Sequence, residues 1–175
     1  HAGFRTSDPL TDLRGGGVLA LQNFVFFAEE FPAHALSLVK RQSRRRQRLY
    51  AYPVAQTAVH LSRLACRLAG LHGSVFDAKT LSEGAAWKLL AHRHGLMQIF
   101  CACFLLFDER WKAGASHLVD FDRVLDATEE EMRAALASRP ASVDLSRYRD
   151  RVNPGPLAAK YLLRQEEEEE EEEEE

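Results

Sequence analysis

Residues 8–17 of the chain, DPLTDLRGGG, place a single arginine between an Asp-Pro turn and three consecutive glycines. Proline fixes the backbone angle φ, and glycine opens conformations that other residues avoid, so the neighbours of Arg14 restrict the shape of this loop. A guanidinium group is a permanent cation with paired N–H donors. Two interpretations remain open: Arg14 forms a bidentate ion pair with Asp8 or Asp12 that fastens the loop, or it reaches a group outside the loop.

The glycines at 15–17 do not predict a nucleotide site within this chain. The pattern G-x-x-x-x-G-K-[ST] is missing, and no strand precedes the glycines. The chain also lacks the G-x-S-x-G nucleophile elbow of many hydrolases. We therefore expect the glycines to serve the backbone conformation and close helix packing, and we expect no cofactor.

One segment has the carboxylate spacing of a calcium-binding loop. In DFDRVLDATEEE, Asp120, Asp122 and Glu131 occupy positions 1, 3 and 12 of such a loop. However, Val124 and Leu125 stand at the fifth and sixth positions, where a ligand and a glycine are required. The segment is not expected to bind calcium.

Histidine and cysteine side chains also fail to form a metal-binding pattern. His92 and His94 are two residues apart, so on a helix they face different directions, and Cys101 and Cys103 lie in the apolar run IFCACFLLF. Partly exposed histidines and buried free thiols are the favoured interpretation, and no metal is expected. With Cys66, the cysteines number three, an odd count that favours reduced thiols and a cytoplasmic protein.

A basic run occupies residues 40–48, KRQSRRRQR. Such a run attracts anionic lipid by about 1 kcal/mol per basic residue near the surface, and it also suits nucleic acid or a nuclear address. A solvated loop or helix end is the alternative without a ligand. No aromatic residues are interleaved, so nucleic acid is not an expected partner. The six residues that we expect at an anionic membrane surface are Lys40, Arg41, Arg44, Arg45, Arg46 and Arg48.

Length and charge predict one domain followed by a tail. The chain has 175 residues and ends in ten glutamates, without which 16 acidic residues remain against 23 basic ones. We expect residues 1–165 to form a single domain and 166–175 to be a solvated tail. The first residue is histidine and no basic-then-apolar leader opens the chain, which suggests an excised fragment. The longest apolar stretch, nine residues, is too short to cross a membrane, so we expect a cytoplasmic domain, peripheral at membranes.

Apolar spacing predicts helices and no strands. Residues 18–31 are apolar on nearly every face, which suits a central helix that shows water one narrow stripe and ends at Pro32. That stripe would contain Gln22, Asn23, Glu29 and Glu30. A second helix begins with Pro53 in its first turn and ends near Gly70. Its buried face would contain Val54, Ala58, Leu61, Ala65 and Leu68, and its exposed face Gln56, His60, Arg63 and Arg67.

Two capping patterns and one long apolar segment complete the set of helices. Thr80 with Glu83, and Thr128 with Glu131, form T-x-x-E patterns that predict helix starts. Residues 96–112, LMQIFCACFLLFDERWK, are long enough for a further helix. Alternating β-branched strands are missing throughout, so the sequence predicts an all-α domain of about six helices.

Three segments resemble the ELMO domain family. The first, GFRTSDPLTDLRGGGVLALQNFVFFAE, resembles the signature G-F-Q-x-x-x-D-P-x-T-D-F-R-G-x-G-x-L-x-L-x-x-L-x-Y-F, with Arg5 and Leu13 standing where that signature has glutamine and phenylalanine. YPVAQTAVHLSRLACRL is similar to the family's Y-P-F-A helix, and FCACFLLFDERWKAGASHLVDFDRVL to its F-D-x-x-W segment. The resemblance covers about residues 3–126, and a tryptophan-bearing segment that usually lies upstream is missing. The matching positions of the signature are Gly3, Phe4, Asp8, Pro9, Thr11, Asp12, Arg14, Gly15, Gly17, Leu19, Leu21 and Phe27.

The resemblance implies an all-helical fold and one of two functions. Some members activate GTP hydrolysis by Arf and Arl small GTPases, and others are engulfment scaffolds that partner Dock exchange factors. The activating members carry an arginine in T-D-x-R-G that is proposed to act in trans, and Arg14 fits this position. The resemblance therefore favours a GTPase-activating domain, with a non-catalytic scaffold as the alternative.

The same resemblance suggests roles for the residues around Arg14. Asp8 and Asp12 would fix the turn, Thr11 would cap it, and Gly15 and Gly17 would leave room for the GTPase. A donated arginine compensates charge that develops on the γ-phosphate, which is worth about 10³ to 10⁵ in rate. GTP and Mg²⁺ would belong to the partner, so this chain would need no cofactor of its own.

Overall fold

The computed structural model describes residues 17–43, 52–71, 86–114, 117–140 and 142–145. Within these ranges the elements are helical and none is a strand, so the predicted all-α fold is confirmed. Six α-helices and one 3₁₀ turn, η2, are described. In chain order they are α2 (Gly17–Glu30), α3 (Pro32–Ser43), α4 (Val54–Leu68), α6 (Trp87–Leu90), α7 (Gly95–Gly114), η2 (Leu118–Asp120) and α8 (Phe121–Leu136).

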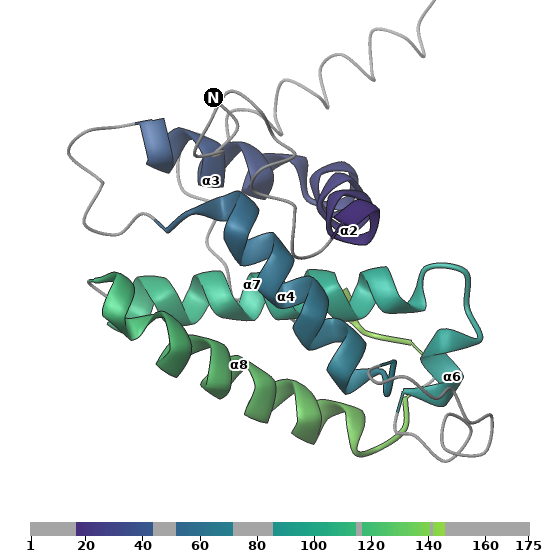
Figure 1. The fold of residues 1–175 in the computed structure, drawn as a ribbon. Helices are drawn as coiled ribbons and strands as arrows, with labels where there is room; N and C mark the ends of the chain where they lie inside the picture. The colour runs from purple at the N-terminus through teal and green to yellow at the C-terminus, as the bar shows by residue number, and fades with distance from the viewer. Residues whose placement is uncertain (1–16, 44–51, 72–85, 115–116, 141, 146–175) are drawn as a thin grey trace, which may run out of the picture.

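Helix α7 is the centre of the fold. Figure 1 shows it running across the molecule, with α4 crossing it, α8 along one side and α2 and α3 on the other. Every residue from Ile99 to Phe107 is buried, because α7 is covered by neighbours around its whole circumference. The apolar run that contains two cysteines is thus a core helix, as its composition predicts.

Helix α4 begins and ends where the sequence predicts. Pro53 precedes its first residue, and Gly70 follows its last turn with a φ of +74°, a conformation that glycine adopts readily. The Gly70 amide donates to the Arg67 carbonyl and the Leu71 amide to the Cys66 carbonyl, at 3.1 and 2.8 Å. These two bonds form a Schellman motif that satisfies the last carbonyls of the helix.

The sequence patterns missed one helix, α3, and misplaced the start of another, α8. Pro32 does follow the end of α2, but it also opens α3, for which the sequence predicted no helix. The T-x-x-E pattern at Thr128 predicted a helix start, and this prediction was wrong. Helix α8 passes through Thr128 without a break, and the buried Thr128 hydroxyl donates to the Val124 carbonyl at 2.7 Å. Thr80 and Glu83 lie outside the described residues.

A glycine sets the close approach between α6 and α7. A Cβ at Gly95, the first residue of α7, would lie 1.9 Å from the carbonyl oxygen of Leu89. No side chain fits at that distance, so α7 can begin directly beside the short helix α6 only if this residue is glycine. The turn that joins α6 to α7, residues 91–94, is exposed at the surface.

Candidate functional site

The described part of the arginine loop begins with Gly17, the first residue of α2. Arg14, Asp8, Thr11, Asp12 and Gly15 lie outside the described residues. Gly17 has a φ of +56°, and a Cβ added there would meet nothing within 4 Å. Glycine therefore suits the backbone conformation here, and no neighbour among the described residues limits the space. The loop joins α2 through a left-handed residue.

Helix α2, which carries this loop, is held firmly by the core. Phe27 is fully buried and its ring lies 4.7 Å from that of Phe104 on α7. Asn23 is also fully buried, and its Nδ2 donates to the Ser62 hydroxyl of α4 at 3.0 Å. The predicted water-facing role of Asn23 is therefore wrong, because the amide serves as a polar link between two helices. The loop thus extends from a helix that is fixed to both α4 and α7.

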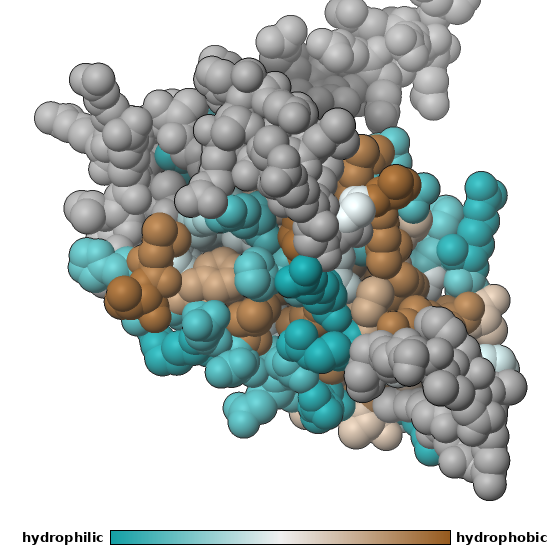
Figure 2. All heavy atoms as spheres, viewed as in Figure 1, coloured by the Kyte–Doolittle hydropathy of each residue, from teal (hydrophilic) through white to brown (hydrophobic). Residues whose placement is uncertain are grey.

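The opposite face of α2 exposes apolar side chains. Val18 is 70%, Leu21 42% and Val25 46% exposed. Their spacing of three and four residues puts them on one side of the helix, and we call these three residues the α2 stripe. Figure 2 shows apolar side chains at the surface where α2 lies. The sequence predicted a polar stripe at this surface; Gln22, Glu29 and Glu30 are indeed exposed, but the apolar stripe lies beside them.

A buried carboxylate joins three helices on another side of the fold. Asp108 of α7 is fully buried and accepts a hydrogen bond from the Tyr52 hydroxyl at 2.8 Å and from Arg41 Nη2 at 2.5 Å. His34 Nε2 and Lys112 Nζ lie 3.0 and 2.8 Å from its other oxygen. We call Asp108, Tyr52, Arg41, His34 and Lys112 the Asp108 cluster. It connects α3, the start of α4 and α7 through one negative charge.

Electrostatics hold this carboxylate in its charged form. Burial alone raises the pKa of Asp108, but its contact with His34 and the positive charges of Arg41 and Lys112 outweigh burial and hold that pKa well below its usual range. Burial, together with the Asp108 charge, raises the pKa of Tyr52 well above its usual value. Tyr52 therefore stays a neutral donor. Asp108 is therefore a charged anchor at physiological pH.

The structure describes two of the basic residues in the basic run. Lys40 and Arg41 both stand in the last turn of α3 and are partly exposed. The Arg41 side chain is only 16% exposed and its charge is paired with Asp108, so this arginine serves the fold in the first place. Arg44, Arg45, Arg46 and Arg48 lie outside the described residues.

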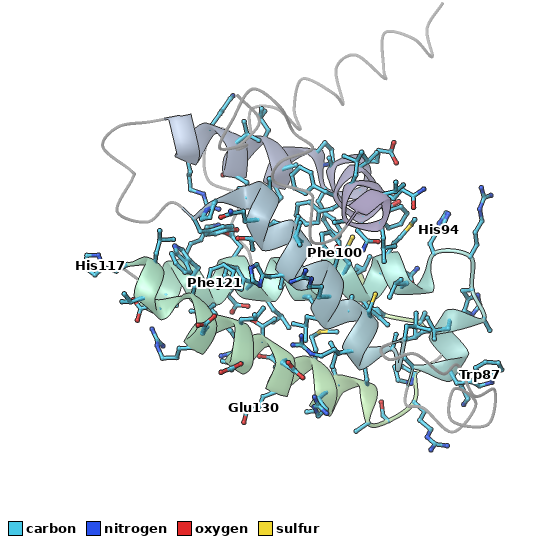
Figure 3. The ribbon with its side chains drawn as sticks, viewed as in Figure 1. Trp87, His94, Phe100, His117, Phe121 and Glu130 are labelled. Atoms are coloured by element: carbon cyan, nitrogen blue, oxygen red, sulfur yellow. The ribbon has the colours of Figure 1, made fainter. Side chains whose placement is uncertain are left out.

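The thiols and histidines that could bind metal are separated. Cys101 and Cys103 are buried free thiols whose pKa values burial raises, whereas His92 and His94 are exposed, as predicted. The His94 ring packs 5.0 Å from Phe26, which places the α6–α7 turn beside α2 (Figure 3). Among the described residues, no three metal-binding side chains come together. Within the same ranges, no helix combines the length and apolar character that crossing a bilayer requires.

Comparison with known families settles the resemblance. Residues 1–125 match the ELMO/CED-12 family. The chain belongs to this family. The ELMO/CED-12 match covers the arginine loop, the α2 stripe and the Asp108 cluster, so these features all lie within the matched domain.

Individual relatives match at modest identity. Engulfment and cell motility protein 3 of Rattus norvegicus is 28% identical over 165 residues, which cover 93% of this chain and 22% of that protein. ELMO domain-containing protein 2 of Homo sapiens is 29% identical over 109 residues, or 62% of this chain and 34% of that protein. ELMO domain-containing protein A of Dictyostelium discoideum is 22% identical over 165 residues, or 81% of this chain and 16% of that protein. No solved structure matches the chain.

Two structural features of this ELMO/CED-12 domain could not be predicted from the sequence. The Asp108 cluster could have been suspected from a single aspartate that ends the apolar run FCACFLLF, since a charge in such a place needs a buried partner. Lys112 stands four residues after Asp108 on the same helix, but the other partners come from residues 34, 41 and 52, and no local spacing indicates those pairings. The α2 stripe has the spacing of a helix face, but a helix that is apolar on all sides does not reveal which side is left uncovered.

Proposed function

We propose that this domain activates GTP hydrolysis by a small GTPase of the Arf or Arl type, with Arg14 supplied in trans. The observation that carries the proposal is the arginine in T-D-x-R-G, the position that distinguishes activating members in the family resemblance. The firm attachment of α2 supports it, because a catalytic side chain must be held in place by a rigid element. Gly17 supports it too, since its left-handed backbone turns the chain at the first residue of α2.

The chemistry needs little from this chain beyond one well-placed cation. Phosphoryl transfer spreads negative charge over the oxygens of the γ-phosphate, and a planar guanidinium can bind two of them at once. GTP and Mg²⁺ are the partner's ligands, and its own residues position the attacking water. A donated arginine contributes about 10³ to 10⁵ in rate, or roughly 4 to 7 kcal/mol of barrier.

A single-turnover hydrolysis assay over a panel of Arf and Arl proteins tests this proposal. The domain should accelerate hydrolysis by at least one GTPase, and Arg14→Ala should abolish the acceleration. Arg133→Lys is the matched control, because Arg133 is an exposed arginine on α8 whose charge this change retains. If the domain accelerates GTP hydrolysis by none of the GTPases in the panel, the proposed activity is refuted.

A non-catalytic scaffold is the second candidate. The observation that favours it is coverage: the engulfment and cell motility relative aligns with 93% of this chain, and ELMO domain-containing protein 2 with 62%. A scaffold would bind a small GTPase or a Dock-type exchange factor without changing hydrolysis. Binding to a GTP-loaded GTPase in the absence of acceleration would favour this function over the first.

We also propose that the basic run brings the domain to anionic membranes, where lipid-anchored GTPases reside. Arg41 is paired with Asp108, and the other basic residues of the run are Lys40, Arg44, Arg45, Arg46 and Arg48. Each basic residue near the surface contributes about 1 kcal/mol, and salt weakens the attraction. Replacing Arg44, Arg45 and Arg46 with glutamine should reduce co-sedimentation with anionic liposomes, and unchanged co-sedimentation would refute this role.

A further inference from the structure

We infer that the α2 stripe is the surface on which the partner GTPase docks while Arg14 reaches its nucleotide. This inference rests on the proposed function and adds where the partner sits and what holds it there. The occupant is a small GTPase that presents apolar side chains beside its nucleotide site.

The first support is the nature of the exposed surface. Val18, Leu21 and Val25 form a continuous apolar face on a helix whose other side is packed against α4 and α7. The partner-facing side of α2 is therefore fixed, because the helix cannot turn this face inward without exposing Phe27 and Asn23. Apolar side chains gathered at one place on a surface are typical of an interaction site.

The second support is the reach of the chain. Four peptide units separate Arg14 from Val18, so their Cα atoms lie at most about 15 Å apart. A specific interface buries about 800 Å² on each partner, which corresponds to a patch roughly 30 Å across. An interface of this size centred on Arg14 therefore also covers the first turns of α2. Val18 and Leu21 are exposed on those turns, beside Gln22.

Charge distinguishes a protein partner from a membrane. Helix α2 contains no lysine or arginine, and Glu29 and Glu30 are exposed at its C-terminal end. An anionic bilayer would repel these carboxylates, and the basic run that attracts lipid begins only in the last turn of α3. An apolar centre bordered by polar Gln22 and Glu29 instead has the composition of a protein interface.

Substitutions in the stripe test the inference. Val18→Asp preserves the fold, because Val18 is 70% exposed and an acidic residue is favourable in the first turn of a helix. Leu21→Gln retains length and helix propensity while removing apolar surface. Val119→Asp is the matched control: Val119 is 89% exposed in η2. Figure 3 shows His117, two residues before Val119, on the opposite side of the view from α2.

The measurements are the affinity for the GTPase loaded with a non-hydrolysable GTP analogue and the single-turnover rate at increasing domain concentration. Val18→Asp and Leu21→Gln should each raise Kd and the half-saturating concentration by about tenfold, because each disturbs an apolar contact at the centre of an interface. The rate at saturation should stay near that of the wild-type domain. Arg14→Ala should lower the rate at saturation and leave Kd near the wild-type value. Val119→Asp should change neither the affinity nor the rate.

The outcomes separate this inference from the proposed function. Stripe variants that bind and activate like the wild-type domain would overturn the inference and leave the function intact. Weaker binding by stripe variants of a domain that binds without accelerating hydrolysis would support the docking surface and refute the activity. Self-association that is lost in the stripe variants while GTPase binding is unchanged would show that a second copy occupies the stripe, and would overturn the inference. A domain that binds no GTPase of the panel overturns both.

Discussion

The Asp108 cluster and the α2 stripe reverse the usual distribution of polar and apolar groups in opposite ways. In the cluster a charged carboxylate is fully buried, and in the stripe three aliphatic side chains face water. Both arrangements cost free energy unless another group compensates: a buried charge loses its hydration, and an apolar side chain in water is less favourable than a buried one. The difference lies in whether the compensating group belongs to the same chain.

In the cluster, compensation is internal. Asp108 is surrounded by Arg41, Lys112, His34 and Tyr52. Removal of one of these side chains should therefore lower the stability of the fold. The stripe has no such compensation within the described residues, so substitutions in it should weaken binding to the partner and leave stability nearly unchanged. We therefore assign the cluster to the fold and the stripe to function, and the following variants test that division.

The largest effect is expected for Asp108→Asn. The variant leaves the charges of Arg41 and Lys112 without their counter-ion, which should lower the free energy of unfolding by about 3–5 kcal/mol. For a domain of this size the melting temperature should fall by about 10 °C. The control is Arg133→Ala on α8, which breaks an exposed pair with Glu129 and should cost less than about 1 kcal/mol. Equal losses from the two variants would contradict the special role of the cluster.

Acid should weaken the cluster in the wild-type domain. Because the pKa of Asp108 is lower in the folded than in the unfolded state, its contribution is present above the ordinary aspartate pKa of about 4 and declines as the pH falls below it. Chemical unfolding of the wild-type domain and of Asp108→Asn between neutral pH and about pH 3 provides the comparison. The stability difference between them should shrink with acidification, and a constant difference would count against a charged Asp108.

A smaller effect is expected for Asn23→Ala, which cuts the polar link between the helix of the stripe and α4. The variant leaves the Ser62 hydroxyl without its amide donor and removes a buried side chain, and it should lower the free energy of unfolding by about 1–3 kcal/mol. Activity per folded molecule should fall as well, because α2 would hold the arginine loop less firmly. Retention of full stability would show that the Asn23–Ser62 bond does not anchor the helix.

The smallest effect on stability is expected for Val18→Asp. An exposed position away from buried contacts should change the free energy of unfolding by less than about 0.5 kcal/mol. Thermal melts of this variant and of Val119→Asp should be alike. A loss comparable to that of Asn23→Ala would mean that the stripe is part of the core, and would end the division between the two regions.

The helices could be predicted from the sequence wherever local chemistry determined them. Pro53 and Gly70 delimit α4 because a fixed φ and a positive φ act on the chain directly. Thr128 shows the limit of such reasoning: the T-x-x-E pattern is a cap only where a helix begins, and packing of Val124 and Met132 continues the helix through it.

The candidate site could be predicted only in part. Arg14 is predicted from its position in a family signature and lies outside the described residues, whereas the family itself is established by the match over residues 1–125. The burial of Asn23 and the exposure of Val25 depend on which sides of α2 meet α4 and α7, and that is a property of the assembled fold. A helix that is apolar on nearly every face does not show in its own sequence which of these faces the neighbouring helices cover.

The most direct test of the central claim is the activity of Arg14→Lys measured together with its melting temperature on one sample. Lysine keeps the positive charge but lacks the planar fork that binds two transition-state oxygens. The account predicts an unchanged melting temperature and a single-turnover rate reduced by about a hundredfold or more. A well-folded Arg14→Lys domain with a near-normal rate would contradict it, and Arg14 would then be a residue that fastens the loop.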